Sequence, residues 1–199
     1  MSPENDIGVI ILAAGSSSRL GEPKQLLAFD GKSLLQIAVD AATNSNAGTV
    51  IEVLGASAEK VAGEINKSNI HTIINADWEE GMASSIRSGL NEILFIAPRT
   101  DAVILMVCDQ PFISSSLLND LINTHRQTGK PIVTCNYGEA IGPPSLFHQS
   151  FFGELMKLKG DVGARKIIQQ HKDQVATVLF KEGKIDIDTK EDYQALKNS

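Results

Sequence analysis

The sequence predicts an α/β fold in which a mostly parallel sheet is covered by helices on both faces. Short apolar runs rich in β-branched residues alternate with stretches of helical apolar spacing from one end of the chain to the other. Such alternation is typical of parallel sheets that are buried on both sides. No repeat, low-complexity tract or linker divides the 199 residues. We therefore expect a single domain over residues 1–199, a common size for one α/β domain.

The expected elements follow one another in order along the chain. Strands are expected at residues 8–13, 49–54, 71–74, 102–107, 132–135 and 175–180, and the first of them has the apolar run of a buried strand. Helices are expected at residues 33–44, 57–65, 82–96, 114–128, 151–158 and 164–171. Ser33 and Gln36 have the spacing of a capping box, and Ser57 stands where a cap of the second helix is needed. Thr189 and Asp192 are spaced as the cap of a short C-terminal helix.

Composition and charge indicate an ordinary globular protein. The chain is 42% hydrophobic and 21% charged, and its net charge of −6 argues against broad, charge-driven binding to nucleic acid or to anionic membranes. The longest apolar runs, such as residues 102–108, are much shorter than the ~20 residues of a membrane helix. The N-terminus lacks the basic start and apolar core of a signal peptide. Cys108 and Cys135 form no metal pattern, so we expect a cytoplasmic protein.

The segment after the first strand has the residues of a polyanion-binding loop. Ligands of such sheets bind beyond the carboxyl ends of the strands. Gly15 and Ser17 let the backbone come close to a ligand, while Arg19 supplies a forked cation and Lys24 a compact one. The segment is neither the dinucleotide fingerprint nor a P-loop. The alternative interpretation is a solvated, flexible loop with incidental charges.

The same segment carries a resemblance to a known family. It contains Leu12-Ala13-Ala14-Gly15-x-Ser17-x-Arg19-x-Gly21-x-x-Lys24. This run resembles the signature of nucleotidyltransferases with the nucleotide-diphospho-sugar transferase fold, and the likeness to molybdenum cofactor cytidylyltransferases extends over almost the whole chain. The resemblance implies a Rossmann-like, three-layer α/β/α domain. It also implies that the loop wraps a nucleoside triphosphate and that the backbone of Leu12–Ala14 helps to read the base.

Carboxylates follow two of the predicted strands. Asp109 comes directly after the strand at residues 102–107, where it is placed either to hold a hard cation or to cap the turn before Pro111. Asp186 and Asp188 face the same side if their segment is extended, although surface charge is the simpler interpretation. The resemblance implies that Asp109 binds Mg²⁺ and that the later pair completes the site, with Asp188 slightly favoured over Asp186.

Further binding residues are expected around these two segments. The resemblance implies that the region after the third strand borders the base and ribose, through Asn75, Gly81 and Ser84; helix capping explains these residues almost as well. Loops before two later helices resemble acceptor-side loops. Gly142 and Pro143 would shape the acceptor pocket. Asp161 and Arg165 would orient the acceptor phosphate, unless Asp161 simply caps a helix. The expected acceptor-side residues are Gln110, Gly142, Pro143, Asp161 and Arg165.

Taken together, the resemblance implies transfer of CMP from CTP to the terminal phosphate of molybdopterin, with release of pyrophosphate. Lys24, Arg19 and Asp109 are the expected catalytic residues, and a phosphate acceptor needs no general base. We expect CTP rather than GTP to be the substrate, because Ala14 stands where guanylyl-transferring relatives tend to have glycine. The alternatives are guanylyl or other nucleotidyl transfer to a different phosphorylated acceptor, and a nucleotide-sensing chaperone that delivers cofactor to a molybdoenzyme. A dinucleotide oxidoreductase lacks support because the glycine fingerprint is missing.

Overall fold

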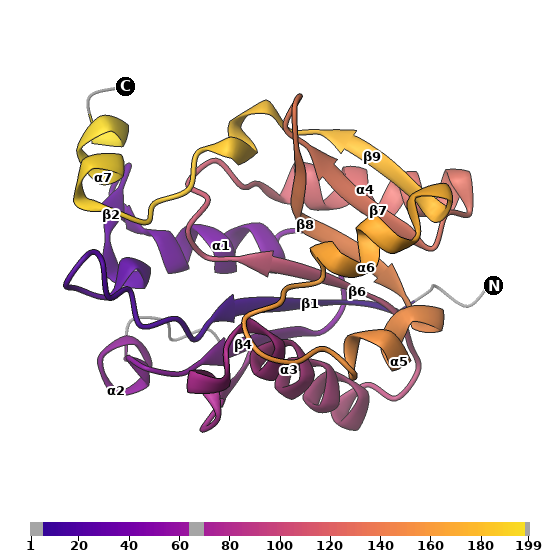
Figure 1. The fold of residues 1–199 in the computed structure, drawn as a ribbon, viewed down its shortest axis with the longest axis horizontal. Coiled ribbons are helices and arrows are strands. Elements are labelled where there is room, and N and C mark those ends of the chain that lie inside the picture. The colour runs from indigo at the N-terminus through magenta and orange to yellow at the C-terminus, as the bar shows by residue number, and fades with distance from the viewer. Residues whose placement is uncertain (1–5, 64–69, 198–199) are drawn as a thin grey trace.

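The computed structural model describes residues 6–63 and 70–197. One sheet contains β1 (Asp6–Ala13), β4 (Val50–Leu54), β5 (His71–Ile74), β6 (Thr100–Val107), β7 (Ile132–Asn136), β8 (Ile141–His148) and β9 (Val175–Leu179). Its order in space is β5-β4-β1-β6-β8-β7-β9 (Figure 1). Among the described strands of this sheet, only β8 runs antiparallel to its neighbours, so the predicted mostly parallel sheet is confirmed. The short strands β2 (Ala28–Phe29) and β3 (Lys32–Ser33) form a separate hairpin.

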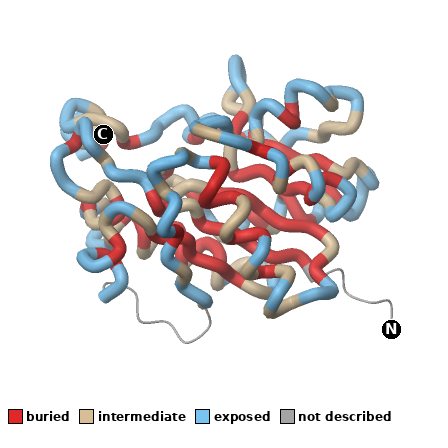
Figure 2. Tube along the Cα trace, turned by 60° about the horizontal axis from the view of Figure 1, so that its bottom comes forward, coloured by how far each residue is buried: buried red, intermediate tan, exposed pale blue. Residues whose placement is uncertain are grey.

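Helices cover both faces of the sheet. They are α1 (Leu34–Thr43), α2 (Ala58–Val61), α3 (Met82–Ile96), α4 (Ser115–Thr128), α5 (Phe152–Leu155), α6 (Arg165–Gln170) and α7 (Lys190–Lys197). Single 3₁₀ turns are η1 (Lys24–Leu26), η2 (Trp78–Glu80), η3 (Gln149–Phe151), η4 (Lys172–Gln174) and η5 (Lys181–Lys184). One core lies between the sheet and α1, α2 and α4, and a second lies between the sheet and α3, α5 and α6. The buried strands run between these two layers (Figure 2), which confirms the three-layer α/β/α fold.

The predicted helix caps agree with the structure in part. Ser33 Oγ accepts from the N–H of Gln36 at 3.1 Å, but the Gln36 amide donates to Asp40, so only half of the capping box is present. Thr189 and Asp192 cap each other as expected at the start of α7. Ser57 precedes α2 but makes no cap hydrogen bond through its side chain. The end of the helix predicted at residues 57–65 lies outside the described residues, and the helix predicted at 151–158 is reduced to η3 and α5.

The segment at residues 142–147 is a strand, where a loop before a helix was predicted. It belongs to β8, which pairs with β6 from Ser145 onward and with β7 on its other side. Pro143 and Pro144 have no N–H to give to a ladder, and prolines are unusual inside a sheet. The pairing with β7 simply passes over both prolines, because its register shifts between Thr134 and Cys135.

The chain reverses its winding at β1, and this fixes where a ligand can bind. The connection from β1 to β4 passes over one face through α1, whereas the connection from β5 to β6 passes over the other face through α3. A crevice opens at such a switch point, at the carboxyl ends of the strands. A third, small core lies beyond these ends and consists of Leu20, Leu27, Leu34, Ile187 and Leu196. Within the two described ranges, no helix combines the length and apolar character needed to cross a bilayer.

Glu52 on β4 provides a test of the core. Its side chain is 2% exposed, its Oε2 accepts from Thr72 Oγ1 at 2.7 Å, and its Oε1 has no hydrogen-bond partner among the described residues. Burial raises the pKa of this carboxyl, and the hydrogen bond from Thr72 opposes the rise only in part. A raised pKa in the folded state means that stability is lost as the pH rises from the unfolded pKa of about 4.3 through the folded pKa.

We therefore expect Glu52→Gln to stabilise the protein at pH 7 by ~1 kcal/mol, or roughly 2–4 °C in Tm. The gain should shrink toward pH 4, where Glu52 is protonated. Differential scanning calorimetry at both pH values measures the effect. Glu59→Gln, on an exposed position of α2, is the matched control and should change neither value. A lower Tm for Glu52→Gln at pH 7 would contradict this account of the buried carboxylate.

Candidate functional site

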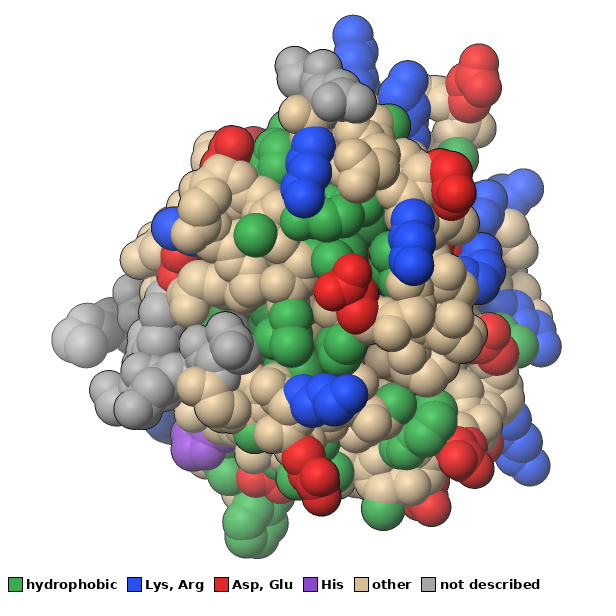
Figure 3. All heavy atoms as spheres, turned by 90° about the vertical axis from the view of Figure 1, so that its left-hand side faces the viewer, with side chains coloured by type: hydrophobic (Ala, Val, Ile, Leu, Met, Phe, Trp, Pro, Cys, Tyr) green, Lys and Arg blue, Asp and Glu red, His purple; other side chains and the backbone are tan. Residues whose placement is uncertain are grey.

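Two adjoining cavities open at the carboxyl ends of β1 and β6. These ends point to the left in Figure 1, and Figure 3 looks onto them, where acidic and basic side chains are interspersed with exposed hydrophobic atoms. The first cavity, of about 270 Å³, lies between the end of β1, η2 and the start of α3. The second cavity, of about 590 Å³, lies between residues 15–20 and the segments around Asp109, Gly142 and Asp188. The two cavities share Gly15, Ser16, Lys24, Met82, Val107, Asp109 and Asp161.

The loop after β1 is held open by its own hydrogen bonds. Ser17 has a left-handed backbone with φ of 53°, and its Oγ accepts from the N–H of Lys24 at 3.0 Å. Gln25, which is 1% exposed, donates its amide to the carbonyl oxygens of Ala13 at 2.7 Å and Gly15 at 3.2 Å. Of the residues that the structure describes, none accepts a hydrogen bond from the N–H of Gly15 or Ser16. These donors are therefore available to a bound anion.

Lys24 joins two carboxylates at the border between the cavities. Its Nζ lies 2.5 Å from Asp109 Oδ2 and 3.1 Å from Asp188 Oδ1. Burial lowers the pKa of this ammonium, but Asp109 and Asp188 outweigh burial and raise it above its ordinary value. Arg19 reaches Asp188 Oδ2 at 3.4 Å from a side chain that is 72% exposed. The structure thus brings together four side chains that the sequence placed in three separate segments.

Asp186 and Asp188 lie on the same side of their segment, as they would in an extended chain. Ile187 is fully buried in the small core, and its N–H donates to the carbonyl oxygen of Asp109 at 3.1 Å. Asp186 and Asp188 on either side of it both line the second cavity. Burial raises the pKa of Asp186, and the neighbouring carboxylates of Asp109 and Asp188 add to the rise. This crowding of negative charge is what a bound cation would relieve.

The donor set at this point fits Mg²⁺ or Mn²⁺ in chemistry. All the available ligand atoms are carboxylate oxygens, which hard cations prefer. Within residues 6–63 and 70–197, no three His, Cys, Asp or Glu side chains are grouped closely enough to hold a metal by themselves. Mg²⁺ commonly uses one or two carboxylates and completes its shell with water and substrate phosphates. The arrangement therefore fits a metal that arrives together with a polyphosphate.

The wall of the first cavity contains some of the expected nucleotide residues and not others. Leu12, Ala14, Gly15 and Gly81 line it, and so does Ser85. Gly55 packs directly against Ala14. A Cβ on Gly55 would lie only 2.6 Å from the Ala14 carbonyl oxygen and 2.8 Å from the Ala14 Cβ. Trp78 also lines this cavity, at its rim.

Three of the expected nucleotide residues lie behind this wall. Asn75 and Ser84 are buried and line neither cavity: the Asn75 amide donates to Ser84 Oγ at 2.8 Å, and Ser84 donates to carbonyls of the turn before α3. Ala13 is also buried, and its carbonyl is taken by Gln25. These side chains hold the turn and the loop that form the wall.

The segment before α6 is fastened onto the start of α3. Gly81 has φ of 110°, and a Cβ at this position would lie 2.6 Å from the backbone nitrogen of Asp161. Arg87 pairs with both carboxylate oxygens of Glu80, at 3.0 and 2.6 Å, and also donates to the carbonyl oxygen of Leu158.

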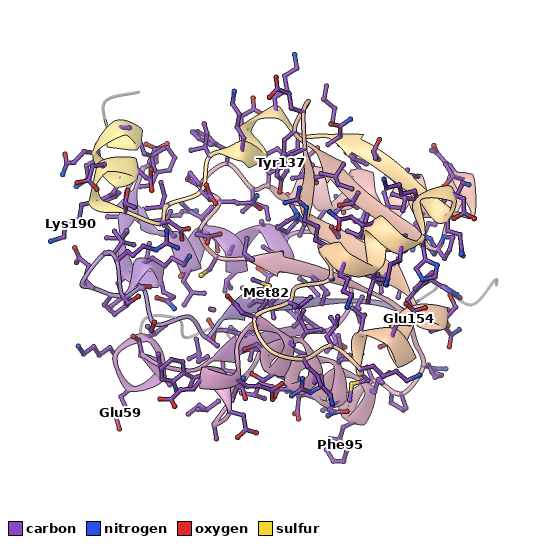
Figure 4. All side chains as sticks on the ribbon, in the orientation of Figure 1. Glu59, Met82, Phe95, Tyr137, Glu154 and Lys190 are labelled. Atoms are coloured by element: carbon purple, nitrogen blue, oxygen red, sulfur yellow. The ribbon has the colours of Figure 1, made fainter. Side chains whose placement is uncertain are left out.

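Asp161 does not cap α6, whose N-cap is Ala164. Its Oδ1 instead accepts from the N–H of Met82 at 3.5 Å. Figure 4 shows Met82 beneath this segment, where it borders both cavities.

The expected acceptor-side residues all line the second cavity, and a residue that the sequence did not single out contacts three of them. Gln110, Gly142, Pro143, Asp161 and Arg165 line this cavity. Tyr137, labelled in Figure 4 beside the chain between β9 and α7, donates its hydroxyl to the carbonyl oxygen of Pro143 and accepts from the Gln110 amide at 2.9 Å. A Cβ on Gly183 would lie 2.2 Å from the Tyr137 ring. No local pattern marks Tyr137, because Gln110 and Gly183 come from other segments of the chain.

Fold and site together define a three-layer α/β/α protein whose cavities lie at the switch point of its sheet. Residues 9–175 match the family described as the MobA-like NTP transferase domain. The chain belongs to this family of nucleotidyltransferases, whose name implies a nucleoside triphosphate substrate.

Individual proteins and solved structures are also similar to this chain. The chain is 32% identical to nicotine blue oxidoreductase of Paenarthrobacter nicotinovorans over 118 residues, which are 59% of this chain and only 56% of that protein's length. It is 26% identical to the purine catabolism protein PucB of Bacillus subtilis over 202 residues, covering 96% of this chain and 95% of PucB. The crystal structure of Rv0371c from Mycobacterium tuberculosis superposes with a TM-score of 0.86 at 32% identity, covering 98% of each chain. A structure of Rv0371c in complex with manganese has a TM-score of 0.81, at 28% identity and with coverage of 98% of this chain and 99% of that one.

The chain has two tyrosines, which allow a matched test of the Tyr137 contacts. Tyr137→Phe removes the hydroxyl that joins Gln110 to Pro143, so we expect a loss of ~1 kcal/mol in unfolding free energy. Because both partners line the second cavity, KM for the acceptor should also rise about fivefold. Tyr193→Phe removes a hydroxyl that makes two hydrogen bonds to Ala28 and lines neither cavity. We expect Tyr193→Phe to lower the unfolding free energy by a similar amount and to leave KM for the acceptor unchanged. Equal effects of the two variants on KM would show that Tyr137 has no role on the acceptor side.

Proposed function

We propose that this protein transfers CMP from CTP to the terminal phosphate of molybdopterin carrying molybdenum, and releases pyrophosphate. The observation that carries the proposal is the convergence of Lys24, Asp109 and Asp188 at the border of two cavities of different size. The smaller cavity has the size for a base, and the larger has room for phosphates and an acceptor. Their border is then where the α-phosphate of a bound nucleotide would lie.

Charge neutralisation and positioning are the whole of the chemistry that this reaction requires from the protein. An acceptor phosphate oxygen attacks the α-phosphorus of CTP, and the bond from that phosphorus to the bridging oxygen breaks, so that pyrophosphate leaves with the electron pair. The acceptor phosphate is already ionised at neutral pH, and no general base is needed. Lys24 would face the α-phosphate, while Arg19 and the N–H groups of Gly15 and Ser16 would hold the leaving phosphates.

Asp109 and Asp188 are the proposed ligands of a divalent cation, with Asp186 nearby as an electrostatic neighbour. When bound, Mg²⁺ supplies positive charge to the phosphate oxygens on which negative charge develops. The manganese complex of Rv0371c supports a divalent cation in this family. Gln110, Gly142, Pro143, Asp161 and Arg165 would form the acceptor side, with Tyr137 positioning the first three.

Removal of the Asp109 charge tests the metal assignment. We expect Asp109→Asn to lower kcat by about 10²-fold or more while the fold is retained, because a main electrostatic stabiliser is lost. Asp101→Asn, near the opposite end of β6, is the matched control and should keep normal turnover. Release of pyrophosphate from CTP and molybdopterin measures kcat, and circular dichroism checks the fold. Near-normal turnover of Asp109→Asn would exclude this residue from the mechanism.

The choice of nucleotide tests the cytidylyl assignment. The methyl group of Ala14 narrows the first cavity and is fixed by Gly55, so a larger purine would leave buried polar groups unpaired at ~1–3 kcal/mol each. We expect kcat/KM for CTP to exceed that for GTP by about tenfold or more. Ala14→Gly should reduce this ratio, and the control Ala97→Gly, beyond the other end of α3, should not.

The product masses and the release of pyrophosphate from both triphosphates decide between the alternatives. A preference for GTP would replace cytidylyl by guanylyl transfer. Binding of nucleotide without release of pyrophosphate in the presence of Mg²⁺ would instead support a nucleotide-sensing chaperone of the cofactor.

A further inference from the structure

Lys24 forms the least exposed ion pair among the described residues. The side chains of Lys24 and Asp109 are 17% and 15% exposed, whereas in every other described pair at least one partner is 38% exposed or more. The same ammonium also holds Asp188, which comes from the far end of the chain. Lys24 therefore bridges two carboxylates that approach each other from β6 and from the C-terminal segment, and the exposed Arg19 reaches only the second of them.

The oxygen atoms that hold this ammonium are those proposed to hold the metal. Lys24 Nζ lies 2.5 Å from Asp109 Oδ2 and 3.1 Å from Asp188 Oδ1. A divalent cation on the same two oxygens would bind at about 2.0–2.1 Å and would lie close to the position of Nζ. The two cations repel each other strongly at such a separation in a partly buried site. Metal binding therefore requires Lys24 to leave.

The Lys24 ammonium has another anion to pair with only when a polyphosphate is present. Its backbone is fixed, because its N–H donates to Ser17 Oγ and it begins η1. Its side chain borders both cavities, so rotation about its own torsions can bring Nζ to either one. Without an anion in the second cavity, an ammonium that has left Asp109 and Asp188 would remain partly buried and unpaired, which is costly.

We propose that Lys24 is a tethered counter-ion that keeps free divalent cations out of the Asp109–Asp188 site until a triphosphate takes over its charge. This inference rests on the proposed function, since it uses the same metal ligands. It makes metal and nucleotide binding interdependent through one side chain. It follows that removal of the Lys24 charge opens the site to metal in the absence of nucleotide.

Binding of Mn²⁺ without nucleotide tests the proposal with no turnover. Titration of free Mn²⁺, followed by electron paramagnetic resonance, compares the unchanged protein with Lys24→Gln and Lys24→Met. Both variants should bind Mn²⁺ about tenfold more tightly than the unchanged protein, within the range of ordinary couplings between ligands. Lys24→Arg keeps the positive charge and should bind Mn²⁺ as weakly as the unchanged protein. Lys32→Gln, which breaks the exposed pair with Asp40, is the matched control and should change nothing.

Thermal unfolding provides a second, independent measurement. In the absence of metal, the repulsion between Asp109 and Asp188 should lower Tm in both charge-removing variants, and Mn²⁺ should raise their Tm more than that of the unchanged protein. If a variant folds only with Mn²⁺, this rescue supports the proposal, and failure of Mn²⁺ to rescue it overturns the proposal.

The outcomes separate this proposal from the proposed function. If the unchanged protein turns over with Mn²⁺ but neither charge-removing variant binds Mn²⁺ more tightly, the counter-ion role is wrong and the proposed function stands. If the unchanged protein neither binds Mn²⁺ in the presence of CTP nor releases pyrophosphate, both are wrong.

Discussion

The hydrogen bond from the Ile187 N–H to the carbonyl oxygen of Asp109 joins the C-terminal segment to the end of β6, and the charged part of the site depends on it. Ile187 is fully buried, so the segment is held by apolar burial as well as by this bond. In an extended segment, burial of one residue turns its two neighbours to the other side. Asp186 and Asp188 therefore face the cavity for the same reason that Ile187 faces the core.

The sheet and the general position of the site were predictable because they follow from periodic patterns and from one topological rule. Apolar runs gave the strands of the parallel part, and ligands bind beyond the carboxyl ends of such strands. Lys24, Arg19 and Asp109 were selected because they follow two of these strands, and the structure places all three in the wall of the second cavity. The alternation that placed Asp186 and Asp188 on one side holds for the same local reason.

Other features could not be predicted, because they depend on individual side-chain and backbone contacts that no sequence pattern marks. β8 contains two prolines, which argue against a strand until it is known that the ladder to β7 passes over them. Tyr137 and Gln25 act through hydrogen bonds to backbone and amide groups that no short motif encodes. Asn75 and Ser84 have the right position in the chain to contact a ligand, but their side chains bond to each other behind the wall. The position of a residue along the chain shows that it lies near a site, but it does not show which way its side chain points.

The small core beyond the sheet has a mechanical consequence. Leu20 and Leu27 bracket Lys24, and both pack in the same cluster as Ile187 and Leu196 of α7. The loop after β1 and the C-terminal segment therefore pack on each other, and the hydrogen bond from Ile187 to Asp109 ties both to the end of β6. The position of α7 and the positions of Lys24 and Asp188 are thus linked through a few leucine and isoleucine side chains outside the main sheet.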